Sequence, residues 1–469
     1  MRGKINPRMH IPQIEIVYFL GIGGIGMSAL ARYFHHHGKI VLGYDKTPTA
    51  LTSELEMSGI SIHYDDTALE IPHLIKVTPR EKILVIYTPA IPKDSNEKNW
   101  FLENGFELKK RSEILGLITA SSNTIAIAGT HGKTTTSSLT AHLIKAAGKN
   151  CNAFLGGITS NYQTNLLLGD TTDWTVVEAD EFDRSFLTLS PNLSVITSMD
   201  ADHLDIYGDA DHVREGFQLF AERLQPHGTI LVKEGLPIDG SKLDSSCTLL
   251  RYSIEGTSDY YAENIRVKKG AYHFDLITPQ GTARNLTIGQ PGRHNVENAV
   301  AACGMALLSG IPLESLALGL ASFKGVHRRF EYIIKSKDIV FIDDYAHHPT
   351  ELKACIDSVR ELYPDQKITG IFQPHLYTRT RDFAADFSAS LSLLDTCILI
   401  PIYPARELPI EGVSSEMLLV DVTSPEKLLL EKSEVLQYLD QHKPEILLTL
   451  GAGDIDVMVA PIKHLLEGK

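Results

Sequence analysis

The sequence predicts an α/β protein with three domains: an N-terminal Rossmann-like domain, a central P-loop-type ATPase domain and a C-terminal Rossmann-like domain. Two glycine-rich loops, each between an apolar strand-like run and a helical pattern, open the first two domains. A third alternation of strands and helices begins near residue 330. Because domains average about 150 residues, the length of 469 agrees with domains at 1–120, 121–329 and 330–469.

Composition restricts the classes of partner. With 43% hydrophobic and 22% charged residues, the chain has the composition of a soluble globular protein. Its net charge of −14 repels phosphate backbones and anionic lipids, so we expect no binding of nucleic acid. No stretch approaches the ~18 apolar residues of a membrane span, and no signal-peptide pattern is present, so we expect no membrane insertion. The five cysteines form no CxxC pair, which favours reduced core thiols and a cytoplasmic location.

The first domain begins with a strand, a loop, a helix and a second strand. Apolar residues 15–20 and 40–44 predict the two strands, and the helix lies between them. Residues 83–91 predict a further strand and residues 96–104 a helix. This alternation favours a mostly parallel sheet covered by helices.

The first glycine loop has the spacing of a dinucleotide fingerprint. Gly21, Gly23 and Gly26 make GxGxxG directly after a strand, and Asp45 ends the next strand. Glycines let a diphosphate approach the backbone, the helix N-terminus stabilises its charge, and the acid can reach a ribose hydroxyl. A purely structural tight turn is the alternative. The motif alone does not distinguish NAD from a UDP-sugar.

In the second domain, strands are expected at 174–178, 193–197 and 229–232. Between residues 249 and 288, alternating runs with turn residues predict a small antiparallel sheet attached to the mainly parallel one. A helix is expected at 295–310. In the third domain, the predicted strands are residues 339–343, 368–372, 396–400 and 445–450.

The second glycine loop predicts a site for a nucleoside triphosphate. It reads GTHGKTT and differs from the usual P-loop only in having Ile127 at the first glycine position. Backbone amides and the helix N-terminus can hold the phosphates, Lys133 adds positive charge, and the Thr134 hydroxyl can reach Mg²⁺. The expected ATP-binding residues here are Gly129, Thr130, His131, Gly132, Lys133, Thr134 and Thr135. One loop for a diphosphate and one for ATP favour a reaction that uses both.

Acidic residues follow two strands of the second domain. The first group is Glu178, Asp180, Glu181 and Asp183, and the second surrounds His203 with Asp200, Asp202 and Asp205. Open α/β sheets place ligands at this end of their strands. A carboxylate and an imidazole on neighbouring strands can hold Mg²⁺ between phosphate groups. A solvated acidic loop is the alternative.

Eight segments taken together resemble the Mur ligases. They read, in order, FLGIGGIGMSALA, AGTHGKTTT, EADEFDRSFL, DHLDIYG, GRHNVENAVAA, GVHRRFE, DDYAHHPTE and FQPHLYTRTRDF. Their order and spacing agree with that family from about Tyr18 to Gly453.

The resemblance implies an ATP-dependent enzyme of peptidoglycan precursor synthesis. The expected reaction joins L-alanine to the lactyl carboxylate of UDP-N-acetylmuramate through an acyl phosphate, with ATP and Mg²⁺ as cofactors. The nearest rival within the family is a recycling ligase that attaches an intact tripeptide to the same sugar nucleotide. An NAD-dependent oxidoreductase and a non-catalytic nucleotide sensor are more distant alternatives. Monomer and dimer remain open.

The resemblance also assigns roles around ATP and the metal. It implies that Lys133 and Thr134 hold the triphosphate, and that Thr134, Glu178 and His203 contact magnesium. Asn295 and Asn298 meet the adenine side, although a helix cap also explains Asn295. Arg328 and Asp344 resemble the pair through which the third domain closes over ATP. Arg329 is the neighbouring alternative, in the role of a structural salt bridge.

Two further sets of residues follow from the resemblance. The UDP-sugar site comprises Gly23, Gly24, Ile25, Gly26, Met27, Ser28, Asp45, Thr88 and Arg111. The amino-acid pocket comprises Tyr345, His347, His375 and Arg379, of which Arg379 suits the carboxylate of L-alanine. His347 or His348 is the candidate base for the amine. A solvated basic face is the alternative for Arg111.

Two departures from the family pattern are visible. Leu376 stands where many relatives have an arginine, which affects the expected anion contacts. Other branches use a carboxylated lysine beside the metals, but the sequence has no lysine between His203 and Lys233. We therefore predict no carbamate.

Overall fold

The computed structural model describes residues 13–169, 173–200, 207–268, 270–405 and 407–468. The chain forms two compact units. Unit 1 comprises residues 1–158, 163–252 and 302–312, and unit 2 comprises residues 159–162, 253–301 and 313–469.

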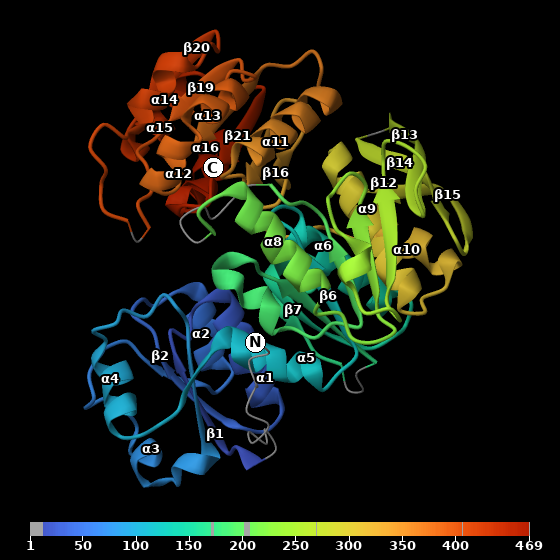
Figure 1. The fold of residues 1–469 in the computed structure, drawn as a ribbon. Coiled ribbons are helices and arrows are strands. Elements are labelled where there is room, and N and C mark those ends of the chain that lie inside the picture. Colours follow the sequence, from blue (N-terminus) through green and yellow to red (C-terminus); the bar gives the residue numbers. More distant parts are fainter. Residues whose placement is uncertain (1–12, 170–172, 201–206, 269, 406, 469) are drawn as a thin grey trace. The chain divides into compact units, whose positions relative to one another are not determined.

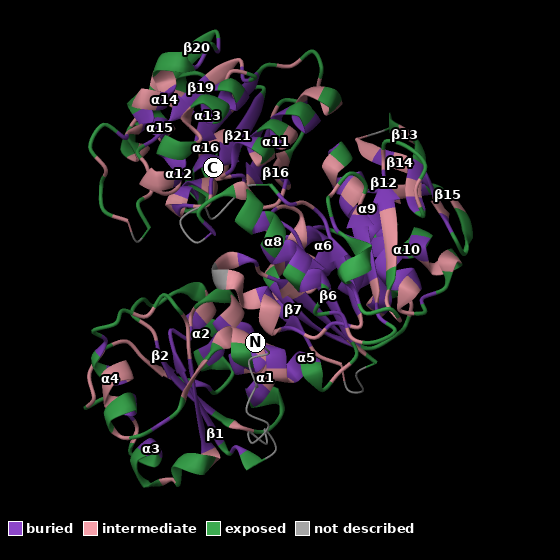
Figure 2. Ribbon diagram, viewed as in Figure 1, coloured by how far each residue is buried: buried purple, intermediate pink, exposed green. Residues whose placement is uncertain are grey.

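The first sheet of unit 1 is parallel throughout, with its strands in the order β3-β2-β1-β4-β5. β1 is completely buried because helices cover both faces of the sheet, which explains its continuous apolar sequence IVYFL (Figures 1 and 2). The strands are β1 (Ile16–Leu20), β2 (Ile40–Tyr44), β3 (Ser61–His63), β4 (Ile83–Tyr87) and β5 (Leu108–Lys110). The helices are α1 (Ile25–His36), α2 (Ala50–Met57), α3 (His73–Val77), α4 (Asn96–Glu103) and α5 (Arg111–Ala120).

The second sheet of unit 1 carries the second glycine loop on its central strand β6. Its strands follow the order β12-β11-β10-β6-β9-β7-β8. They are β6 (Thr124–Ala128), β7 (Cys151–Thr159), β8 (Thr164–Leu167), β9 (Trp174–Ala179), β10 (Leu193–Ile196), β11 (Thr229–Lys233) and β12 (Thr248–Ser253). Helices α6 (Lys133–Ala146) and α8 (Ala210–Ala221) pack with this sheet, and the short helix η3 (Phe182–Thr188) follows β9.

Unit 2 contains three antiparallel strands, which belong to a ten-stranded sheet, and a mainly parallel sheet of its own. The antiparallel strands are β13 (Tyr260–Lys268), β14 (Ala271–Thr278) and β15 (Gly281–Ile288). The other sheet has the order β16-β17-β21-β18-β19-β20, formed by β16 (Glu331–Lys335), β17 (Val340–Asp344), β18 (Ile368–Phe372), β19 (Thr396–Leu399), β20 (Glu426–Leu429) and β21 (Ile446–Leu450).

The remaining helices are α9 (Arg293–Leu308), α10 (Leu316–Ser322), α11 (Pro349–Leu362), α12 (Tyr377–Asp382), α13 (Ala384–Leu391), α14 (Ser415–Asp421), α15 (Lys432–Gln441) and α16 (Val459–Leu466). In the described part of the chain, no helix combines the length and apolar composition needed to cross a bilayer.

The predicted α/β fold is confirmed, although the strand expected at residues 83–91 ends at Tyr87, and two further local corrections follow. The expected antiparallel region began at residue 249, but β12 pairs in parallel with β11, and only the strands from Tyr260 onward are antiparallel. The second correction concerns β16, an antiparallel edge strand that the sequence did not indicate. The thiol prediction holds for Cys151, Cys303, Cys355 and Cys397, which are buried and free, whereas Cys247 is free but only half-buried.

Candidate active site

The second glycine loop requires glycine at two positions. It leaves the fully buried strand β6 and enters α6. Gly129 has φ of +138° and Gly132 has φ of +80°, conformations that other residues rarely adopt. A Cβ at Gly129 would lie 2.0 Å from Oγ1 of Thr197 on the loop after β10. The backbone at Gly129 therefore passes too close to its neighbour to carry a side chain.

The side chain of Lys133 lies at the start of α6 and is held by oxygen atoms. Its Nζ donates to the Gly129 carbonyl at 2.7 Å and lies 2.9 Å from Oε1 and 2.8 Å from Oε2 of Glu181. Burial lowers the pKa of Lys133, but the carboxylates of Glu181, Asp180 and Glu178 outweigh burial and hold it above its ordinary value. Lys133 is therefore a cation.

Glu181 is a functional candidate to which sequence reasoning gave no separate role. Its side chain is buried, and its carbonyl accepts a hydrogen bond from the Tyr207 hydroxyl at 2.8 Å. The sequence placed it in an acidic group but gave no signal that it pairs with a lysine 48 positions earlier. Burial holds the pKa of Glu181 above its ordinary value and outweighs the pairing with Lys133, which lowers that pKa, so the pair offsets only part of the cost of burial.

Oxygen ligands for a hard cation lie beside Lys133. The Thr134 hydroxyl donates to Oε1 of Glu178 at 3.2 Å, and the Gly156 amide donates to Oε2 at 3.0 Å. Hydroxyl and carboxylate oxygens are the donors that Mg²⁺ prefers, so these residues fit the ion. His203, the third expected ligand, lies outside the described residues. Among the described residues, no group of three or more His, Cys, Asp or Glu side chains is arranged to hold a metal.

The rest of the second loop is tied to the segment after β10. The hydroxyls of Thr130 and Ser198 are 2.9 Å apart, and the His131 amide donates to Oγ of Ser198 at 2.7 Å. Nε2 of His131 lies 3.2 Å from Oδ2 of Asp200. Thr135 is buried inside α6. The loop is thus held in shape from a neighbouring strand.

The first glycine loop is held by the end of β2. The Tyr44 carbonyl accepts from the amides of Gly21 and Ile22 at 2.8 and 3.0 Å. Oδ2 of Asp45 accepts from the Gly23 amide at 2.7 Å. Asp45, expected to meet a ribose, therefore also supports the loop.

Arg111 lies over the first loop. A Cβ at Gly26 would be 2.1 Å from Nη1 of Arg111, and Nη2 lies 3.5 Å from Oδ2 of Asp180. The structure thus brings Arg111 to the loop, where it supplies positive charge. Among the other expected residues, Met27 and Ser28 are buried, Gly24 and Ile25 are exposed, and the Thr88 methyl group would lie 2.6 Å from a Cβ at Gly21.

In unit 2, Asn295 and Asn298 bond to each other. Nδ2 of Asn295 donates to the Pro291 carbonyl at 2.6 Å, and Nδ2 of Asn298 donates to Oδ1 of Asn295 at 3.3 Å. Both side chains are buried on the first turns of α9. Beside them, burial lowers the pKa of His294 to about 4, so its imidazole is neutral.

Arg328 and Asp344 each have other partners in unit 2. Nη2 of Arg328 donates to the Gly451 carbonyl at 2.7 Å, and Nε to Oδ2 of Asp343 at 3.3 Å. Asp344 accepts from the amides of Phe330 and Ala346, both at 2.7 Å, and burial raises its pKa to about 6. Both residues organise the segment that enters the C-terminal sheet.

The structure brings three residues of the expected amino-acid pocket together. Nδ1 of His347 lies 3.0 Å from the Tyr345 carbonyl, and the rings of His347 and His375 are 6.2 Å apart. The Tyr345 ring lies 5.0 Å from the guanidinium of Arg328. Arg379 is buried on α12, one turn after Leu376.

His348 and Leu376 have distinct structural features. Nδ1 of His348 accepts from the Thr350 amide at 3.3 Å and caps α11. Leu376, the N-cap of α12, has φ of +69° and ψ of 136°, a strained conformation for a side chain with a Cβ. Such strain is common at binding sites.

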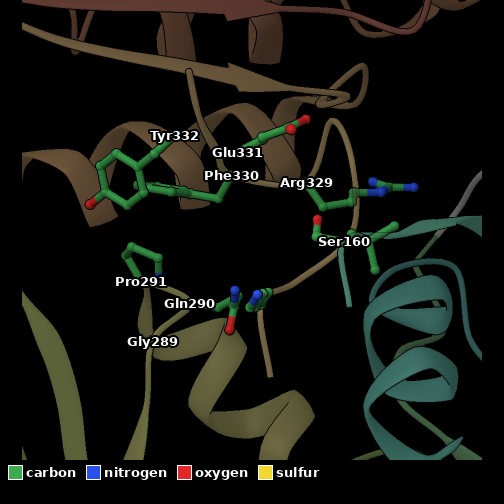
Figure 3. A pocket seen from close by; sticks show the side chains of 10 residues that line it. Ser160, Gly289, Gln290, Pro291, Arg329, Phe330, Glu331 and Tyr332 are labelled. Carbon is green, nitrogen blue, oxygen red and sulfur yellow. The ribbon is translucent and has the colours of Figure 1, made fainter. Parts of the chain in front are cut away.

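Unit 2 also has a cavity of about 260 Å³ beside the segment that carries Arg328 (Figure 3). Figure 3 shows aromatic and proline rings on one side and Arg329 on another. Its walls are Ser160, Gly289, Gln290, Pro291, Lys324, Val326, Arg329, Phe330, Glu331 and Tyr332. None of the residues expected to bind ATP, UDP-sugar or amino acid is in this lining.

Comparison with known proteins covers nearly the whole chain. Three family models match: the Mur ligase family catalytic domain at residues 16–123, the Mur ligase middle domain at 127–306, and the Mur ligase glutamate ligase domain at 328–455.

Two curated relatives are named UDP-N-acetylmuramate–L-alanine ligase. The one from Parabacteroides distasonis is 52% identical over 98% of each chain. The one from Porphyromonas gingivalis is 50% identical over 96% of this chain and 99% of its own. The crystal structure of the UDP-N-acetylmuramate-alanine ligase from Thermotoga maritima superposes with a TM-score of 0.79 at 27% identity, covering 96% of this chain and 99% of that one.

Proposed function

The chain belongs to the Mur ligase family, and on that premise we propose that it joins L-alanine to the lactyl carboxylate of UDP-N-acetylmuramate at the expense of ATP. The product is a precursor of peptidoglycan. The observation that carries this proposal is the pair of glycine loops in unit 1, one with Lys133, Thr134 and Glu178 and the other under Arg111. A dehydrogenase would not need Lys133, Thr134 and Glu178, because it binds no triphosphate. A nucleotide sensor would not need an amino-acid pocket.

In this proposal, each of the three domains predicted from the sequence binds one substrate. Residues 1–120 bind the UDP-sugar, residues 121–329 bind ATP, and residues 330–469 bind L-alanine. The proposed location is the cytoplasm, which supplies both ATP and UDP-sugars. The full-length similarity to L-alanine ligases favours L-alanine over a tripeptide as the cosubstrate.

The chemistry overcomes the low reactivity of a carboxylate. An amine does not displace oxide from an anionic carboxylate, so the lactyl carboxylate first attacks the γ-phosphorus of ATP to give an acyl phosphate and ADP. The Lys133 ammonium stabilises charge on the transferring phosphoryl oxygens. Thr134 and Glu178, with His203 as the family resemblance implies, would hold Mg²⁺, which would supply further neutralisation of phosphate charge.

The second half-reaction forms the amide bond. The amine of L-alanine attacks the acyl carbon, and the tetrahedral intermediate collapses by expelling phosphate. Arg379 binds the free carboxylate of the amino acid, and His347 accepts the amine proton. His348 is less suited to that step because its Nδ1 already caps α11. The side chains of unit 2 thus position the amine and receive its proton.

Phosphate release from ATP tests the proposal. The enzyme is supplied with UDP-N-acetylmuramate and Mg²⁺, together with L-alanine, D-alanine, glycine, L-serine or the tripeptide in separate reactions, and products are identified by mass. Release with L-alanine, far faster than with the other additions, is the expected result. Release with the tripeptide alone would identify a recycling ligase, and ATP binding without product in any reaction would identify a sensor.

A further inference from the structure

A polar cluster lies inside the apolar core of the first sheet. The Tyr18 hydroxyl is 2.6 Å from Oε2 of Glu97 and 2.8 Å from Nε2 of His63, and that nitrogen is 3.2 Å from Oε1 of Glu97. Tyr18 and Glu97 are completely buried. The three residues come from β1, β3 and α4, so the cluster connects elements distant in the sequence.

Burial keeps this cluster neutral near pH 7. Burial is the largest cause that raises the pKa of Glu97, to about 8, and burial lowers the pKa of His63. A protonated Glu97, the Tyr18 hydroxyl and a neutral His63 can form one chain of hydrogen bonds with no net charge. Apolar side chains of similar volume would fill this space with a smaller desolvation penalty. The buried polar cluster is therefore a candidate for a positioning role.

The cluster is joined to the first glycine loop through two contacts of β3. The His63 carbonyl accepts from the Asp45 amide at 3.1 Å, and Asp45 in turn accepts from the Gly23 amide. The His63 ring also lies 5.6 Å from the ring of Tyr44, whose carbonyl holds Gly21 and Ile22. Asp45 and Tyr44, which hold the loop, therefore both contact His63.

The other side of the cluster is fixed to α4. Asp66, three residues after β3 ends, accepts from Oγ of Ser95 and from the amides of Asn96 and Glu97 at 3.1, 3.1 and 2.9 Å. β3 itself is a short edge strand that pairs only along three residues of β2. Its position thus depends on side-chain contacts more than on its backbone ladder.

We propose that Tyr18, His63 and Glu97 are positioning residues for the sugar-nucleotide site, which hold β3 so that Asp45 and Tyr44 shape the loop of residues 21–26 for a diphosphate. This inference rests on the proposed function, because the diphosphate is that of the UDP-sugar. The three side chains act through Asp45 and Tyr44 and need not touch the substrate.

Replacing the central hydroxyl tests this role. Tyr18→Phe keeps the ring and removes both hydrogen bonds, and Phe101→Leu is the matched control because the Phe101 ring packs 4.8 Å from that of Tyr18 without a polar group. Calorimetry measures binding of UDP-N-acetylmuramate, and steady-state rates give kcat and each KM. A buried hydrogen bond is worth about 1 kcal/mol, so we expect Tyr18→Phe to raise the KM and Kd for the UDP-sugar about fivefold.

The pattern across substrates separates positioning from general destabilisation. For Tyr18→Phe, kcat and the KM values for ATP and L-alanine should stay within about twofold, and Phe101→Leu should leave the UDP-sugar Kd unchanged. Glu97→Gln retains a hydrogen-bonding side chain and should restore part of the affinity that Glu97→Leu loses. If Tyr18→Phe does not fold, His63→Gln carries the same expectation, because His63 lies nearer the surface.

Three outcomes would overturn the inference. Wild-type protein that binds the UDP-sugar, together with Tyr18→Phe or His63→Gln variants that bind it equally well, would refute the positioning role alone. Equal losses in Tyr18→Phe and Phe101→Leu would do the same, because they would show a stability effect. Wild-type protein that binds no UDP-sugar would instead refute the proposed function, and this inference with it.

Discussion

The two glycine loops of unit 1 have the same secondary-structure setting but receive their positive charge from different places. Each leaves a buried parallel strand and enters a helix. The second loop carries its cation in the loop sequence itself, as Lys133, and pairs it with buried Glu181. The first has no lysine and receives its positive charge from Arg111, at the start of α5, 85 positions after Gly26 by residue number.

This difference agrees with the ligands that we propose. A triphosphate that reacts needs a charge fixed against the transferring phosphoryl group, which the first residue of α6 provides. A diphosphate that only anchors a sugar needs a well-shaped backbone and a more distant cation. The first loop is accordingly shaped through its own backbone amides, which donate to the Tyr44 carbonyl and to the Asp45 side chain.

The largest expected effect comes from removing the cation of the second loop. Lys133→Ala should lower kcat about 100- to 1000-fold because one preorganised donor to the phosphoryl oxygens is lost. Phosphate release under saturating substrates measures it. Lys149→Ala, which removes an exposed lysine three residues after the end of α6, is the control and should remain near wild type. Near-normal turnover by Lys133→Ala would show that Lys133 does not stabilise the transferring phosphoryl group as the lysine of a P-loop does.

The next effect concerns the counterion of Lys133. Glu181→Gln leaves a buried ammonium without its partner and should cost about 3 kcal/mol of the free energy of unfolding in nucleotide-free protein. A bound triphosphate would replace the lost charge, so ADP or an ATP analogue should raise the Tm of the variant more than that of wild type. Thermal scans with and without nucleotide measure this, with the exposed Glu103→Gln as control. Equal nucleotide shifts would contradict the counterion role.

A smaller effect should follow from removing the distant cation of the first loop. Arg111→Ala should raise the KM for UDP-N-acetylmuramate about 10- to 100-fold and leave the KM for ATP unchanged, because charge-assisted hydrogen bonds contribute about 1.5–3 kcal/mol. Lys110→Ala, at the exposed neighbouring residue, tests whether charge alone matters. Similar KM values for both variants would favour the solvated basic face over a site at Gly26.

The smallest expected effect is a pH dependence of the stability that Glu97 contributes to the folded protein. The pKa of Glu97 rises from 4.5 to about 8 on folding, mainly through burial. Between those values the folded chain holds the extra proton, so this stability is complete below pH 4.5 and is lost as pH rises through 8. The Tm of wild type should therefore fall more between about pH 6 and about pH 9 than that of Glu97→Gln. Parallel curves would mean that Glu97 is already ionised in the folded protein.

Local signals were enough to predict the fold class. Strand β1 is a fully buried, continuous apolar run, and the predicted bounds match those of the mostly buried strands β2 and β18. The antiparallel prediction was wrong for β12, because pairing direction depends on where the chain returns and not on the alternation within one strand. The site assignments that rest on the family resemblance stay predictions.

The sequence alone determined the two glycine loops, their order and the strands that carry them, because glycine conformations and hydrophobic periodicity act over a few residues. Only the tertiary structure decided that Glu181 neutralises Lys133, that Arg111 lies over Gly26 and that Tyr18, His63 and Glu97 share a buried network. Each of these contacts joins residues from different elements. Their energies depend on burial and on distances of about 3 Å, which are set only when the sheets and helices pack.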